Sequence, residues 1–182
     1  MGNHKSTVPS VAVKPTDSHE SWVIKNCNLP RDLYYDVEHD MWARKESNGD
    51  VSLGLTDVGQ TAVGKLQIIS FTRRAQMIGQ RLEAGHTIAL LESAKWVGPV
   101  RLPVPGILIR VNTDLLTHPL WVNLEPYGNG WVVVFRPDEE IPWMHGEKAR
   151  DAYAQRLTQT FRSVAGVNDD FWCVHCNDWD EL

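Results

Sequence analysis

Residues 91–100 read LESAKWVGPV, and the arrangement of the chain follows from this stretch. An apolar strand at 87–91 enters it and a second apolar segment, 100–111, leaves it, so Lys95 is expected near a connection between two strands. Small residues precede the lysine, and a Gly-Pro pair turns the chain after it. A lysine at such a tip is held by the strands but projects into solvent. It is therefore accessible to an enzyme that acylates its amine, which removes the charge and adds a long arm.

The alternative interpretation is an ordinary solvated loop lysine, which is the usual state of this side chain. Lys65 is the other lysine near ordered structure, but its neighbours at 63–66 resemble a helix end rather than a hairpin tip.

Upstream of this stretch, the sequence predicts a hairpin followed by a short helix. Asn48-Gly49 separates apolar arms at 41–44 and 51–55, and a type I′ turn favours these two residues because both its positions need positive φ. A helix is expected over 57–66, with Asp57 as its N-cap and Gln60 completing a capping box.

Short strands with glycine turns dominate the rest of the domain. They are expected at 66–71, 87–91, 102–111, 120–124 and 130–135, the third starting at an edge or corner because of its prolines. Since no helices alternate with the strands, a parallel α/β sheet is disfavoured and the expected fold class is mainly β, a barrel or sandwich.

Apolar residues recur every three or four positions near the C-terminus, which predicts one further helix ending at Gly166. The residues of its apolar face are Ala149, Tyr153, Leu157, Phe161 and Val164. The expected organisation is a flexible leader (1–21), a β domain (22–137), a helical extension (138–166) and a flexible acidic tail with cysteines (167–182).

Composition excludes several function classes. The formal net charge is −5 and the basic residues are not clustered, so nucleic-acid binding is not expected. No apolar run reaches the length of about 20 residues that a membrane helix needs. The N-terminal residues lack an apolar signal-peptide core, and the expected compartment is the cytoplasm.

Four segments together resemble the H protein of the glycine cleavage system. Residues 92–96, ESAKW, are similar to that family's lipoylation site. Three further segments match in the family's order between about residues 34 and 137: 53–57 (LGLTD), 102–112 (LPVPGILIRVN) and 119–131 (PLWVNLEPYGNGW). A biotin carrier is disfavoured, because Ala94 and Trp96 stand where it would carry methionines.

The resemblance implies a flattened lipoyl-type β-barrel (a hybrid barrel-sandwich) with short helices and a C-terminal helix. It implies a carrier rather than an enzyme, with lipoate covalently attached to Lys95 by a lipoate attachment enzyme. Glu92 would help that enzyme to recognise the site, and the alternative is a solvated rim carboxylate.

Residue 96 is a tryptophan, where glycine-cleavage proteins usually have alanine. The chain is also longer at both ends, with residues 27–35 before the barrel and a cysteine-containing tail after it. These features resemble the lipoate-binding proteins of bacterial sulfur oxidation. That resemblance implies an arm on Lys95 that shuttles sulfur intermediates with a heterodisulfide-reductase-like complex and dihydrolipoamide dehydrogenase, since a dithiolane opens and closes by thiol exchange. The alternative is a glycine cleavage H protein that carries the aminomethyl group between glycine decarboxylase and aminomethyltransferase.

The cysteines leave several interpretations open. Cys173 and Cys176 belong to a tail without chemistry, to a redox pair that exchanges with the arm, or to a metal site with His175. Zinc usually takes four ligands, which this segment does not supply, and no metal is expected. A thiol oxidoreductase using both cysteines is the enzyme alternative. Cys27 is expected to pack as a small apolar residue.

Overall fold

The computed structural model describes residues 21–162. Its strands are β1 (Ser21–Ile24), β2 (Cys27–Pro30), β3 (Tyr34–Asp36), β4 (Met41–Lys45), β5 (Val51–Leu55), β6 (Leu66–Phe71), β7 (Arg81–Leu82), β8 (Thr87–Ser93), β9 (Val97–Arg101), β10 (Gly106–Val111), β11 (Trp131–Pro137) and β12 (Met144–His145). The helices are α1 (Asp57–Val63), α2 (Trp121–Leu124) and α3 (Glu147–Arg162), with 3-10 turns η1 (Arg73–Gln76) and η2 (Thr113–Leu116).

Two antiparallel sheets enclose the main core, as predicted for a mainly β fold. A seven-stranded sheet has the order β12-β3-β4-β5-β11-β10-β7, and a three-stranded sheet has the order β6-β8-β9. Inward side chains of both sheets form one cluster, which includes Leu53, Phe135, Ile88 and Val100. The two ladders do not join into a closed hydrogen-bonded barrel, so the arrangement is the sandwich form of the lipoyl-type fold.

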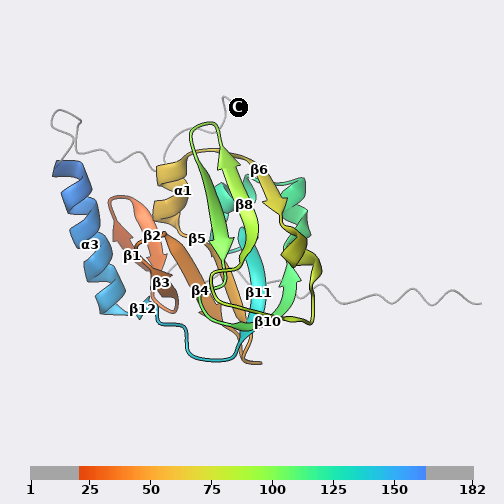
Figure 1. The fold of residues 1–182 in the computed structure, drawn as a ribbon. Coiled ribbons are helices and arrows are strands. Elements are labelled where there is room, and N and C mark those ends of the chain that lie inside the picture. The colour runs from red at the N-terminus through yellow and green to blue at the C-terminus, as the bar shows by residue number, and fades with distance from the viewer. Residues whose placement is uncertain (1–20, 163–182) are drawn as a thin grey trace, which may run out of the picture.

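A second core cluster lies on the other side of β4, under α3. It joins residues of the β1–β2 hairpin, β3, α1 and α3: Cys27, Leu29, Leu33, Tyr35, Trp42, Val58, Tyr127, Ala149, Tyr153 and Leu157. Figure 1 shows α3 packed along the β1–β2 hairpin at one side of the molecule. The helical prediction at the C-terminus and the packed state of Cys27 are therefore confirmed, whereas Val164 and Gly166 lie outside the described residues.

The hairpin of β4 and β5 forms, but its turn is not the predicted type I′ turn. Gly49 has a positive φ of 86°, and the loop is closed by Glu46 N donating to Asp50 O at 2.8 Å, which makes it a three-residue loop. The two-residue turn with both φ values positive instead joins β1 to β2, at Lys25 (49°) and Asn26 (65°). The type I′ assignment to Asn48-Gly49 was wrong because the strand register sets the loop length.

The helix α1 begins where expected but ends at Val63 rather than at 66, because Gly64 with its positive φ terminates it, and its N-cap also differs. Thr56 caps it, accepting a hydrogen bond from Gly59 N at 3.0 Å. Asp57 is the first helical residue, and its carboxylate accepts from Gln60 Nε2 (2.6 Å) and from Asn28 N (2.6 Å). The predicted cap was displaced by one residue because the buried carboxylate of Asp57 joins the helix to β2.

The strand prediction at 120–124 was wrong: residues 121–124 form α2. A five-residue apolar run does not distinguish strand from helix, and Pro119, which lacks a backbone N–H, favours a helix start there. The segment 102–111 becomes a strand only from Gly106, after Pro105. The strands predicted at 66–71, 87–91 and 130–135 are confirmed as β6, β8 and β11.

Candidate functional site

Lys95 lies at the tip of the β8–β9 hairpin, as predicted from its neighbours. β8 ends at Ser93 and β9 begins at Val97, and Ser93 N donates to Trp96 O at 2.9 Å to close the loop. The lysine side chain is exposed. Figure 1 shows this tip projecting from the sheet at the top of the view, beside α1. The hairpin thus places the amine at an end of the molecule where another protein can reach it.

Ser93 ties the tip to the end of α1. Its hydroxyl is buried and donates to Val63 O at 2.8 Å, and the Ser93 Oγ in turn accepts a hydrogen bond from Lys95 N at 3.4 Å. The backbone beneath the lysine is therefore held by two elements, the strand and the helix terminus. The backbone of the lysine therefore has a defined position at the tip.

The side chain of Lys95 crosses Gly64, the C-cap of α1. A Cβ at Gly64 would stand 3.2 Å from Lys95 Cε and 3.7 Å from Nζ, and Gly64 has a positive φ of 78°. The positive φ favours glycine there, whereas the flexible end of the lysine side chain can move away from an added Cβ. Within residues 21–162 no carboxylate forms an ion pair with the Lys95 ammonium.

A buried amide supports this corner from below. Asn123, on α2, accepts from Leu66 N at 2.9 Å and donates to Gln60 Oε1 (3.1 Å) and Gly64 O (3.0 Å). It is fully buried, so its amide ties α2 to both ends of the α1–β6 connection. Sequence analysis missed Asn123 because the segment was predicted as a strand, in which its side chain would have a different direction.

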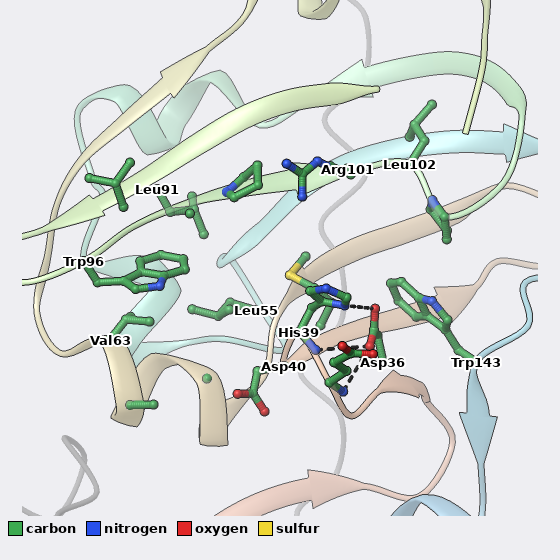
Figure 2. A pocket seen from close by; sticks show the side chains of 18 of the residues that line it. Asp36, His39, Asp40, Leu55, Val63, Leu91, Trp96, Arg101, Leu102 and Trp143 are labelled. Carbon is green, nitrogen blue, oxygen red and sulfur yellow. Dashed lines mark hydrogen bonds and ion pairs between the residues drawn. The ribbon is translucent and has the colours of Figure 1, made fainter. Parts of the chain in front are cut away.

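A pocket of about 610 Å³ opens beside the tip, and one of its walls is Trp96, the residue after the lysine. Apolar side chains such as Leu55, Val63 and Leu91 line the part near Trp96. In Figure 2, Trp96 stands at one side of this pocket and Trp143 at the other. The pocket is suited to an apolar chain that starts at Lys95.

Trp96 can lie in that wall because Gly98 has no side chain. A Cβ at Gly98 would lie 1.9 Å from Trp96 Cζ2, so the indole lies directly against the backbone of β9. The ring is partly buried and packs against the main core. The Trp96–Gly98 pair is therefore one structural unit, which the sequence indicated only as a departure from alanine.

The turn between β3 and β4 supplies the polar wall of the pocket. His39 Nδ1 lies 2.9 Å from Asp36 Oδ2, and Figure 2 shows the two side chains joined at the pocket floor. Glu38 and Asp40 of the same turn also line the pocket, as does Arg101 of β9, which forms no ion pair among residues 21–162. The pocket thus has an acidic side and one cation facing an apolar interior.

The helix α3 holds this turn in place. Arg156 forms an ion pair with Asp40 and donates to Val37 O at 2.5 Å. Burial raises the pKa of the Asp40 carboxyl, while the Arg156 guanidinium acts in the opposite direction. Asp40 has a positive φ of 57°, so the turn has an uncommon backbone conformation that this contact helps to maintain. Sequence analysis missed Arg156 and the turn, since no local pattern joins segments so far apart.

The other candidate residues from the sequence, Glu92 and the cysteines, lie apart from one another. Glu92 is exposed on the outer face of the three-stranded sheet, paired across the strands with Ile68 and Val97. Cys27 is buried beside Thr61, with Sγ 3.8 Å from Oγ1. Cys173 and Cys176 lie outside the described residues, so the interpretations of the cysteine tail stay predictions.

Comparison with known proteins bears directly on this site. The family model of the glycine cleavage H-protein matches residues 33–156, more than half of the chain. The chain belongs to the glycine cleavage H-protein family. H proteins are carriers rather than enzymes, and they hold a lipoate covalently on a lysine. The matched range contains the Lys95 hairpin, the pocket and the first part of α3 through Arg156.

Individual H proteins agree with this assignment. Glycine cleavage system H protein 3 of Aquifex aeolicus is 37% identical over 167 residues, covering 88% of this chain and 96% of that protein. The probable glycine cleavage system H protein 2 of Sulfurisphaera tokodaii is 37% identical over 145 residues, covering 77% and 93%. A crystal structure of an H protein from Mycobacterium marinum has a TM-score of 0.58, at 24% identity and 68% and 97% coverage, and shows the same fold.

Within residues 21–162 no helix has both the length and the apolar character to cross a membrane. The comparisons name glycine cleavage H proteins and do not show a role in sulfur oxidation, which stays a prediction.

Proposed function

We propose that Lys95 is the lipoyl attachment site of this H protein and that the arm serves glycine cleavage. The observation that carries the proposal is the position of Lys95: exposed at a hairpin tip fixed by Ser93, beside a pocket whose wall begins at Trp96. The amine attacks the carbonyl carbon of a lipoyl adenylate, an amide bond forms, AMP leaves, and a proton passes to solvent. The product is an uncharged arm on a rigid base.

The pocket supports a role in holding the arm between partners. Its apolar part starts at the attachment point, so it suits the hydrocarbon chain of the lipoyl group. Its acidic turn, with Asp36, Glu38 and Asp40, suits a cationic aminomethyl group at the end of the arm. We therefore expect glycine decarboxylase and aminomethyltransferase as partners, besides the lipoate attachment enzyme.

The experiment is lipoylation of the full chain by a purified lipoate–protein ligase, read by intact mass and peptide mapping. We expect a mass increase of one lipoyl group on the peptide that contains Lys95, none in Lys95→Arg, and an unchanged increase in the control Lys65→Arg. Lipoate on Lys65, or on no lysine, would refute the proposal.

Sulfur transfer is a second candidate, which two observations favour. Trp96 lies on Gly98 beside the arm's root, where the related pattern usually has alanine, and Arg101 is a pocket cation without an ion pair among residues 21–162. An arm that carries an anionic sulfur group would match Arg101. Here the partners would be a heterodisulfide-reductase-like complex and dihydrolipoamide dehydrogenase.

Reconstitution distinguishes the two candidates. If the lipoylated chain accepts aminomethyl groups from glycine decarboxylase as well as an established H protein does, glycine cleavage is supported. If it fails there but restores a sulfur-oxidising strain that lacks its own copy, and Lys95→Ala does not, the sulfur role replaces it.

A further inference from the structure

Arg101 is the cation of the pocket beside Lys95. It stands at the end of β9, its side chain is exposed and lines the pocket, and it forms no ion pair among residues 21–162. In Figure 2 it lies between Trp96 and Trp143, which stand at the two sides of the pocket. Most surface arginines are simply solvated, so the position of this one relative to Lys95 carries the argument.

The carboxylates of the pocket are largely occupied by other groups. Asp36 is hydrogen-bonded to His39 at 2.9 Å, and Asp40 forms its ion pair with Arg156 of α3. The third carboxylate, Glu38, is exposed in the same turn. Apart from these groups and the arginine of β9, no charged side chain of the described residues lines the pocket. The β9 guanidinium is therefore the charge that is left for a bound anion.

The length of a lipoyl arm matches the distance from Lys95 to Arg101. The strand β9 spans Val97–Arg101, and at about 3.3 Å per residue it covers about 13 Å. Val97, Gly98 and Pro99 also line the pocket, so the cavity follows this strand. About a dozen bonds separate the Cα of a lipoyl-lysine from its sulfurs, so an extended arm reaches roughly 15 Å. An arm that enters the pocket along β9 therefore brings its sulfur end within reach of the guanidinium.

We propose that Arg101 binds the sulfur end of the reduced arm and holds one of its two thiols as a thiolate. The thiol gives its proton to solvent, no electrons are transferred, and the thiolate pairs with the guanidinium. A guanidinium beside a thiol favours the ionised form over the neutral one. The thiolate is also the form that exchanges with a disulfide of another protein. Arg101 therefore keeps the reduced arm in the state that a reoxidising partner needs.

This inference rests on the proposed function of Lys95 and adds a role for the pocket after the cargo has left the arm. The acidic turn suits a cationic cargo, whereas Arg101 suits the anionic sulfur that remains when the cargo is gone. The two sides of the pocket would thus hold different states of one arm. The inference applies to the reduced arm itself, whichever cargo the arm carries.

The test is a pH titration of the lipoylated full chain, reduced with a phosphine, in which the ultraviolet absorbance of the thiolate is measured. The same titration of the unlipoylated chain is subtracted, which removes the contribution of the three cysteines. Arg101→Gln is expected to lower the thiolate fraction of the arm at neutral pH by about tenfold, because an opposite charge within a few ångströms shifts a thiol pKa by about 1 or more. Arg101→Lys keeps the charge and is expected to restore most of the thiolate.

Arg73→Gln is the matched control. Arg73, in η1, is exposed, lies outside the pocket and forms no ion pair in the described part of the chain, so this variant makes the same change in net charge. Its titration is expected to equal that of the parent chain. Equal thiolate fractions in Arg101→Gln and Arg73→Gln would overturn the inference while attachment at Lys95 stands. Intact mass and peptide mapping show whether Lys95 carries lipoate, and its absence there would refute the proposed function and the inference with it.

Discussion

At the residue scale, the contact between Trp96 and Gly98 is the most sensitive feature of the site. A Cβ at Gly98 would overlap the indole at 1.9 Å, so Gly98→Ala forces Trp96 out of the pocket wall. We expect a loss of about 1–3 kcal/mol in the free energy of unfolding, the usual cost of overpacking. In the background of Trp96→Ala the same change should cost clearly less, because the overlapping atoms are gone. Denaturant unfolding of the four proteins in this double-mutant cycle checks the expectation, and equal costs in both backgrounds would contradict it.

Asp40 makes the free energy of unfolding depend on pH. Burial raises the pKa of its carboxyl above the ordinary value, so the folded state binds this proton more tightly than the unfolded chain does. Ionisation of Asp40 therefore lowers the free energy of unfolding as the pH rises from about 4 through the folded-state pKa.

Asp40→Asn removes this contribution. The stability of the parent chain relative to the variant should fall over that pH range and then level off. Unfolding measurements from about pH 4 to pH 7 test it, with the exposed Glu139→Gln as the control variant. A difference that grows with pH would reverse the assigned sign.

At the element scale, α3 acts on the pocket through one side chain. Arg156 reaches both Asp40 and Val37 O in the β3–β4 turn. Arg156→Ala leaves the buried carboxylate without its partner, and we expect a loss of about 2 kcal/mol in the free energy of unfolding. Arg150→Ala on the same helix breaks only exposed ion pairs with Glu147 and Asp151, which solvent screens, and should cost clearly less than Arg156→Ala. Similar losses in the two variants would show that the turn does not depend on α3.

At the scale of the whole molecule, β4 connects the two cores. Met41 and Ala43 face the main cluster between the sheets, while Trp42 faces the second cluster with Tyr153 of α3. Trp42 Nε1 also donates to Pro126 O at 2.9 Å, which ties this strand to the segment before β11. Because one strand serves both clusters, the two are expected to unfold together.

Tyr153→Ala tests this coupling. The ring is fully buried, and its removal should lower the free energy of unfolding by about 3–5 kcal/mol. Hydrogen exchange should then show the same loss of protection in α3 and in β4 and β5. An α3 that opens alone, with the sheets keeping their full protection, would contradict a single cooperative unit.

The sequence by itself determined the local features of this protein. The Lys95 hairpin, most of the strands, α1 and α3 follow from patterns of near neighbours, because strand alternation, helical periodicity and turn residues act over a few positions. The resemblance over segments around the lysine also led to the family before any tertiary contact was known. The type I′ turn, the N-cap of α1 and the strand at 120–124 failed for one common reason: strand register and buried polar contacts overrode weak local preferences.

Only the tertiary structure decided the surroundings of the lysine. Asn123 lies under Gly64 across 59 positions of the chain, Arg156 meets Asp40 across 116, and Ile68 joins Glu92 and Val97 through strand pairing. No short pattern encodes such contacts, since they depend on how whole elements pack. The proposed attachment residue, Lys95, could therefore be predicted from its own segment, whereas the pocket and the contact of Arg156 with the β3–β4 turn became visible only when the sheets and helices were assembled.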